Sequence, residues 1–138
     1  MLSNQECINI INFTEEIGYV RTSLYTDRRG IEHYNTNTRK SEQCIIDDER
    51  FIGKLLKRIK HCIPPTYQGK EFHSINERVR FLKYDGEGHF KRHADGKYTD
   101  EDNGIESMIT VLLYFNEDYE GAFTTFYGNK NDKVQLPA

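Results

Sequence analysis

The sequence has no tryptophan, little cysteine and proline, and no long hydrophobic run. The three cysteines, Cys7, Cys44 and Cys62, are widely spaced and form no CxxC pair, which argues against a zinc knuckle. Reduced thiols are typical of cytosolic and nuclear proteins. No signal peptide is visible, and no apolar run reaches the roughly 18 residues that a membrane helix needs. We therefore expect a cytoplasmic or nuclear protein with no membrane partner.

An excess of basic charge is also missing, because the net charge is −3. Dedicated nucleic-acid-binding proteins usually carry a basic excess, so we expect no nucleic-acid partner. Aromatic residues are plentiful, with nine Tyr and eight Phe, and such a composition argues against a disordered chain. The 138 residues predict one domain with a modest core.

The first half of the chain carries two helical patterns. Ser3 and Glu6 match a capping box, and apolar residues at helical spacing predict a helix over 4–17 that stops at Gly18. Residues 19–46 look irregular, with short strands near 19–25 and 31–35. Asp47-Asp48 opens a second helix, which Pro64-Pro65 ends.

In the second half of the chain the residue pattern alternates with a period of two, which predicts strands. Four strands are expected, over 77–84, 90–95, 107–115 and 122–127, with turns at 85–88 and 116–121. Helices followed by consecutive strands predict an α+β fold with a mainly β core.

The triplet His93-Ala94-Asp95 carries the clearest chemistry. In a strand, residues two apart point to the same face, so the imidazole and the carboxylate can converge on one metal ion. Two histidines and one carboxylate, with three open positions, form the ligand set of non-haem iron(II) oxygenases. A lone His-x-Asp is common, however, so the prediction of a metal site depends on the residues around it.

Those surroundings resemble the prolyl 4-hydroxylase type of iron(II)- and 2-oxoglutarate-dependent dioxygenases. The stretch from Ser107 to Gly121, SMITVLLYFNEDYEG, is similar to the family pattern S-x-x-T-x-L-x-Y-L-N-x-x-x-E-G-G-x-T, although Ala122 replaces the second Gly. The other similar segments are 76–84, 86–95 and the helix starts at Leu2-Ser3 and Asp47-Asp48. The resemblance implies an incomplete double-stranded β-helix (jelly-roll or cupin-like) over 76–138, with residues 1–75 as helical support.

The resemblance also implies roles for five residues. His93 and Asp95 would be iron ligands, and Tyr84, Tyr114 and Thr124 would line the 2-oxoglutarate pocket. The alternative for both tyrosines is aromatic core packing. The implied cofactors are Fe(2+), 2-oxoglutarate as cosubstrate and ascorbate as reductant. The implied reaction is hydroxylation of a C–H bond in a protein, peptide or small molecule, with peptidyl proline the family's best-known substrate.

The chain departs from the family at the third iron ligand, a later His, and at the Lys or Arg about ten residues after it. None of the five histidines follows Asp95. In a continuous strand His89 would lie roughly 13 Å from His93, too far for a metal bond of ~2 Å. The third ligand is therefore unknown. We expect a partial or truncated domain with weak iron binding and little turnover.

Three further hypotheses remain open. The chain could be a non-catalytic remnant that binds a peptide or partner. The acidic loop 96–106 could cover a substrate or be a solvated turn. Arg78 and Arg80 are expected to brace their strand through ion pairs. Calcium binding at 100–104 is disfavoured, because the spacing does not match an EF-hand loop.

Overall fold

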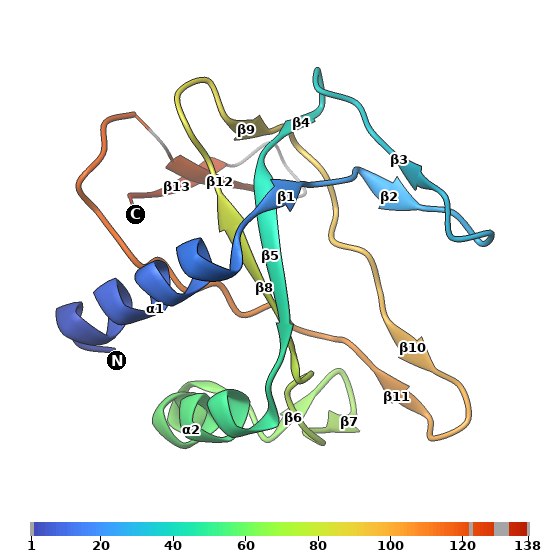
Figure 1. Cartoon of the computed structure of the whole chain (residues 1–138). Helices are drawn as coiled ribbons and strands as arrows, with labels where there is room; N and C mark the ends of the chain where they lie inside the picture. Colours follow the sequence, from blue (N-terminus) through green and yellow to red (C-terminus); the bar gives the residue numbers. More distant parts are fainter. Residues whose placement is uncertain (1, 122, 129–132, 138) are drawn as a thin grey trace.

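Two helices and a set of short antiparallel strands make up the computed structural model, which describes residues 2–121, 123–128 and 133–137 (Figure 1). In chain order the elements are α1 (Asn4–Ile17), β1 (Val20–Arg21), β2 (Tyr25–Thr26), β3 (Glu32–His33), β4 (Arg39–Lys40), β5 (Glu42–Asp47), α2 (Glu49–Ile59), the 3-10 helix η1 (Lys60–Cys62), β6 (Thr66–Tyr67), β7 (Lys70–Glu71), β8 (Arg78–Lys83), β9 (His89–Phe90), β10 (Thr99–Asp100), β11 (Ile105–Glu106), β12 (Phe123–Tyr127) and β13 (Lys133–Pro137). The predicted α+β class is confirmed at this level.

The largest sheet of the described residues has three strands in the order β1-β5-β8. β5 is central and pairs antiparallel with β8 along six residues, with Cys44 opposite Phe81. The expectation of irregular structure up to residue 46 was therefore wrong for β5. Its apolar run, Cys44-Ile45-Ile46, is short, and the strand is defined by neighbours on both sides that lie far away in the sequence. The sheet thus joins the two halves of the chain.

Both predicted helices are confirmed, with their caps. The Ser3 hydroxyl accepts a hydrogen bond from the Glu6 amide while the Glu6 carboxylate accepts one from the Ser3 amide. α1 ends at Gly18, whose φ of 96° favours a residue without Cβ. The Asp48 side chain caps α2 by accepting from the Phe51 amide.

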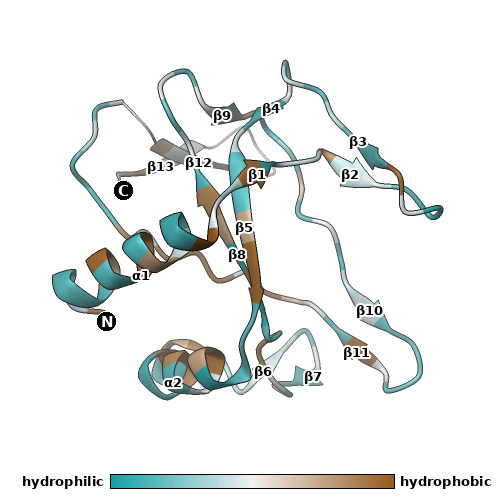
Figure 2. Cartoon of the chain, viewed as in Figure 1, coloured by the Kyte–Doolittle hydropathy of each residue, from teal (hydrophilic) through white to brown (hydrophobic). Residues whose placement is uncertain are grey.

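The two helices lie on the same side of the β5–β8 pair and cover it (Figure 1). The buried apolar side chains Cys44, Leu55 and Phe81 come from β5, α2 and β8. Phe51 of α2 packs on Phe81 with ring centroids 6.3 Å apart. Hydrophobic colouring gathers on α2 and on the part of β5 nearest to it (Figure 2). The core therefore lies between the helices and one face of this sheet.

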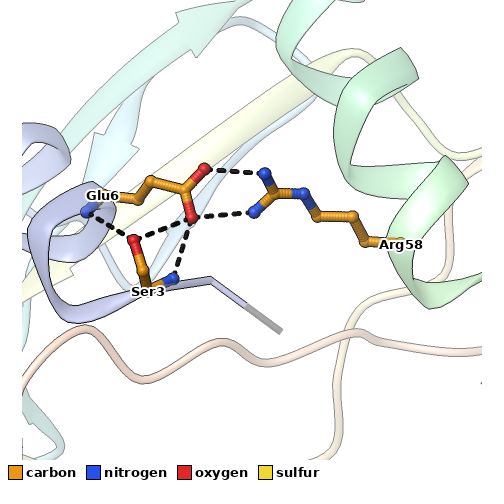
Figure 3. Close-up of polar contacts among 3 residues, drawn as sticks. All are labelled: Ser3, Glu6 and Arg58. Atoms are coloured by element: carbon orange, nitrogen blue, oxygen red, sulfur yellow. Dashed lines mark hydrogen bonds and ion pairs between the residues drawn. The ribbon is translucent and has the colours of Figure 1, made fainter.

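A polar network joins the first turn of α1 to α2. Arg58 donates from both terminal nitrogens to the Glu6 carboxylate, at 2.7 and 2.9 Å (Figure 3). The same carboxylate accepts from the Ser3 amide at 2.8 Å. Arg58, and then the Ser3 amide, lower the pKa of Glu6 to about 2. The capping box is thus also linked to α2 through this ion pair.

Two of the four predicted strands were wrong. Of the expected strand over 90–95 only Phe90 belongs to a strand, β9, and residues 107–115 form no strand. An apolar alternating sequence makes a strand only where a neighbour completes its hydrogen bonds. The predicted strand over 77–84 is confirmed as β8, and that over 122–127 as β12, although Ala122 lies outside the described residues. The described strands do not close into a barrel.

Candidate metal centre

His93 and Asp95 lie in an irregular segment that follows β9, not in the strand that was expected. Their side chains nevertheless converge, with His93 Nε2 3.4 Å from Asp95 Oδ1. Both side chains are partly exposed, so a ligand can reach them from solvent. The proposed metal pair is thus brought together by the loop, although not by the strand geometry that predicted it.

Each member of the pair is held by a second contact. His93 Nδ1 lies 2.8 Å from the Lys91 carbonyl oxygen, which can only accept, so this nitrogen carries the proton. Nε2 is the ring nitrogen that faces Asp95. The Thr110 hydroxyl donates to Asp95 Oδ2 at 2.7 Å, which leaves Oδ1 for the side that faces His93. Metal-ligating residues usually show such outer contacts.

The spacing of the pair suits two adjacent ligands of one ion. Bonds of about 2.0–2.2 Å from nitrogen and oxygen to a metal leave the two atoms roughly 3 Å apart when the ligands are neighbours. The 3.4 Å separation needs only a small adjustment. Among the described residues no group of three His, Cys, Asp or Glu side chains gathers at one point. His93 and Asp95 therefore fit two positions of an iron(II) site, and the described residues supply no third.

His89 is directed elsewhere. Its Nδ1 lies 3.0 Å from the Glu87 carbonyl oxygen and its Nε2 lies 3.4 Å from the Asn37 carbonyl oxygen. Both ring nitrogens are thus engaged by the backbone, so His89 does not join His93 and Asp95.

Two of the three residues predicted for the cosubstrate pocket meet each other. The hydroxyls of Tyr114 and Thr124 are 2.5 Å apart, which joins the segment before the 116–121 turn to β12. Tyr84 does not take part in this contact and lies beside Arg39. Tyr84 and Tyr114 are 43% and 45% exposed, so neither is a buried core aromatic. The Tyr114 hydroxyl contacts Thr124, and the Tyr84 hydroxyl contacts Arg39.

Two residues that contact the site were not predicted from the sequence. The Phe90 ring stacks on the His93 ring, with centroids 3.5 Å apart. The Arg39 guanidinium lies over the same phenyl ring, 4.3 Å from its centre. Arg39 and Phe90 are opposite residues in the β4–β9 pair. This pairing spans 51 residues of sequence, and no local pattern reveals it.

The two arginines of β8 that were expected to form ion pairs, Arg78 and Arg80, differ in their contacts. The expected bracing is confirmed for Arg78, whose Nε lies 2.9 Å from Asp47 Oδ1 across the β5–β8 pair. This contact raises the pKa of Arg78 and lowers that of Asp47. Arg80 forms no ion pair within the described part of the chain, so the prediction is not confirmed for it.

The acidic loop 96–106 is a β10–β11 hairpin with a turn at 101–104. Its base is fixed, because Lys97 and Lys70 both contact the Glu106 carboxylate. At the turn, the Asp100 carboxylate accepts hydrogen bonds from Asn103. The hairpin is therefore tied to β7 through Lys70.

Comparisons with protein-family models, curated proteins and solved structures found no match to this chain. Neither of the α-helices, nor any other helix in the described ranges, is long and apolar enough to cross a membrane.

Proposed function

We propose that this chain carries part of the active site of an iron(II)- and 2-oxoglutarate-dependent dioxygenase of the prolyl 4-hydroxylase type. The observation that carries the proposal is the convergence of His93 Nε2 and Asp95 Oδ1 at 3.4 Å. The Lys91 carbonyl holds His93 through Nδ1, so that Nε2 faces Asp95, and the Thr110 hydroxyl orients Asp95. The arrangement of the strands as an incomplete double-stranded β-helix is part of the same proposal.

The residues around the pair suit a small polar cosubstrate. Bound iron and 2-oxoglutarate would supply the oxidation of a C–H bond, with ascorbate as the reductant that maintains iron(II). The hydroxyls of Tyr114 and Thr124 form one polar group, and the Tyr84 hydroxyl is a second. Both can donate hydrogen bonds to a carboxylate. The substrate is a protein, peptide or small molecule, with a peptidyl proline as the first choice to assay.

The first experiment measures metal binding by the 138-residue chain. Mn²⁺ stands in for iron(II) and is titrated by electron paramagnetic resonance into the wild type and into the His93→Ala and Asp95→Ala variants. We expect weak binding that each variant abolishes, because the described residues supply two ligands. His61→Ala, which changes an exposed histidine of η1, is the matched control and should bind like the wild type. Equal binding by His93→Ala and the wild type would reject the proposed centre.

The second experiment measures turnover. Succinate formation from 2-oxoglutarate by this chain, with iron(II) and ascorbate, is expected to be slow and to require His93. Fast turnover would show that a third ligand is supplied in a way that the described geometry does not contain.

A non-catalytic binding role is the second candidate. The observation that favours it is that no third metal ligand is found among the described residues. Binding of a proline-rich peptide by His93→Ala as tightly as by the wild type, together with no metal-dependent succinate formation, would favour this candidate over the enzyme.

A further inference from the structure

The outward side of α2 carries a line of positive charge. Arg50, Lys54 and Lys57 are exposed and lie three or four residues apart, which places them on one side of the helix. Leu55, the buried residue of α2, lies on the opposite side. We call Arg50, Lys54 and Lys57 the basic stripe. Because the whole chain has a net charge of −3, the stripe reverses the overall sign locally.

No carboxylate neutralises the basic stripe. In the described part of the chain no Asp or Glu lies within ion-pair distance of its three residues, whereas Arg58 of the same helix is paired with Glu6. Like charges three or four residues apart repel each other and weaken a helix. The stripe therefore lowers the stability of α2 and gains nothing from ion pairs. Such a surface is a candidate for binding a partner of opposite charge.

A hollow of about 500 Å³ lies at the end of the same helix. The side chains that line it are Lys60, Ile63, Pro65, Thr66, Glu71 and Phe72. Lys60 follows Lys57 by three residues and begins η1, so the hollow continues from the basic stripe. Half of its lining residues are apolar, and a volume of this size accepts an aromatic or large aliphatic side chain.

We propose that the basic stripe and the hollow together bind an acidic peptide segment of a partner protein, with its carboxylates over the stripe and an apolar side chain in the hollow. In an extended peptide, alternate side chains point the same way and lie about 7 Å apart. Along the axis of α2, Arg50 and Lys54 are separated by about 6 Å and Lys54 and Lys57 by about 4.5 Å. Lysine and arginine side chains are long and flexible, so each can reach one carboxylate of such a peptide.

A short peptide suits this surface better than a nucleic acid or a membrane does. Charges are screened over about 8 Å at physiological salt, so a short peptide interacts with the stripe and little with the rest of the chain. A nucleic acid or an anionic membrane extends beyond the stripe and meets a protein of net charge −3. Glu71 also lines the hollow, where it would repel a phosphate. None of these residues belongs to the proposed metal centre, so the inference holds or fails independently of the proposed function.

The test uses a capped peptide of four glutamates followed by one phenylalanine. Its binding to the 138-residue chain is measured by NMR titration. One control peptide carries glutamine in place of each glutamate, and another carries glycine in place of phenylalanine. We expect each control to bind about tenfold more weakly or less well still, because one loses the ion pairs and the other the apolar contact. Added salt should weaken binding of the acidic peptide, because the stripe is exposed.

Charge variants locate the acidic part of the peptide. The double variant Lys54→Gln, Lys57→Gln should weaken binding of the acidic peptide about fivefold. The double variant Arg28→Gln, Arg29→Gln removes two exposed positive charges from the turn between β2 and β3 and is the matched control for net charge. Equal affinity of the two double variants for the peptide overturns the role of the stripe.

A variant of the hollow locates the apolar side chain. Phe72→Ala should remove the preference for the phenylalanine peptide over the glycine peptide. If Phe72→Ala does not fold, as judged by circular dichroism, Pro65→Glu decides, because it places a charge at an exposed position of the hollow. An unchanged preference in the variant that folds overturns the role of the hollow.

The other polyanions complete the test. A single-stranded oligonucleotide and vesicles that contain phosphatidylserine are titrated in the same way. Tighter binding of either one than of the peptide, lost in the Lys54→Gln, Lys57→Gln variant, assigns the stripe to that polyanion and overturns the proposal. The proposal is equally overturned if the acidic peptide does not bind at millimolar concentration.

Discussion

The two faces of the β5–β8 pair differ in what covers them. We call the face under α1 and α2 the helix face; its residues Cys44 and Phe81 are buried. On the opposite face, which we call the open face, Ile45, Leu82 and Tyr84 are each about two-fifths exposed, at 41%, 39% and 43%. Along β8 the residues of the helix face are less exposed than their neighbours, whereas in β5 Gln43 of the open face is buried like Cys44. The helix face gives stability, and the open face leaves side chains accessible for binding.

The polar groups of the two faces differ in the same way. On the helix side, Lys83 lies 2.9 Å from Glu15 of α1, and Arg58 of α2 is paired with Glu6. On the open side, buried Arg39 has no described carboxylate partner, and the Gln43 side-chain oxygen is orphaned. Satisfied polar groups stabilise a fold, whereas a buried polar group without a partner is costly.

Truncation of the helix face should have the largest effect. Phe81→Ala removes a ring that packs on Phe51 and on Phe115, and we expect a loss of about 3–5 kcal/mol in the free energy of unfolding. Leu82→Ala, the adjacent residue on the open face, should cost about 1 kcal/mol or less. Urea unfolding monitored by circular dichroism measures both. Equal losses would mean that the two faces do not differ as described.

The second prediction concerns metal affinity at His93 and Asp95. Thr110→Val removes the hydroxyl that donates to Asp95 Oδ2, and Mn²⁺ binding should weaken about tenfold or more, because the carboxylate loses its orientation. Unfolding in urea should change little, since Thr110 is exposed. Thr99→Val, at an exposed position of β10, is the matched control. Unchanged Mn²⁺ affinity in Thr110→Val would show that this hydrogen bond does not position the ligand.

The third prediction tests a buried hydroxyl on the helix side. Thr14 is 1% exposed; its hydroxyl donates to backbone carbonyls one turn earlier and accepts from the Tyr19 hydroxyl at 2.8 Å. Thr14→Val should cost about 1–2 kcal/mol, because the Tyr19 hydroxyl loses its acceptor. The double variant with Tyr19→Phe should cost less than the sum of the two single changes. Strict additivity of the two costs would show that the hydroxyls do not interact.

The parts of the fold that depend on local sequence were predictable. Ser3 and Glu6 are three residues apart and Gly18 follows the last turn, so the limits of α1 could be derived from neighbours in the sequence. Asp48 marked the start of α2, and the prolines at 64 and 65 marked the end of the helical segment, whose last part is η1. β8 was predicted from its alternation, which one covered face imposes.

The parts that depend on distant partners were not predictable. The 107–115 segment has strong strand character but pairs with no described strand, and β5 has weak strand character but lies between two. His93 and Asp95 were found through residue type and resemblance, although the expected strand was not there. Arg39 was missed, because only the β4–β9 pairing brings it to Phe90. Local sequence patterns thus singled out His93 and Asp95 as candidates, whereas no local pattern could show that Arg39 lies against Phe90.

The smallest effect is expected where the helix side meets solvent, at the Glu6–Arg58 contact. Arg58 and the Ser3 amide lower the pKa of Glu6 from 4.5 to about 2, so the folded state favours the ionised carboxylate. A lowered pKa gives stability that is present in full above about pH 4.5 and is lost as the pH falls towards about 2. Glu6→Gln should therefore be less stable than the wild type at neutral pH, with a difference that shrinks as the pH falls across this range.

Urea unfolding at several pH values measures this difference in stability. Added salt should reduce it, because the pair is partly exposed. Glu16→Gln changes another exposed carboxylate of α1 and is the control. If Glu6→Gln and Glu16→Gln follow the same pH profile, the contact does not join the helices in solution, and the helix face depends on its apolar packing alone.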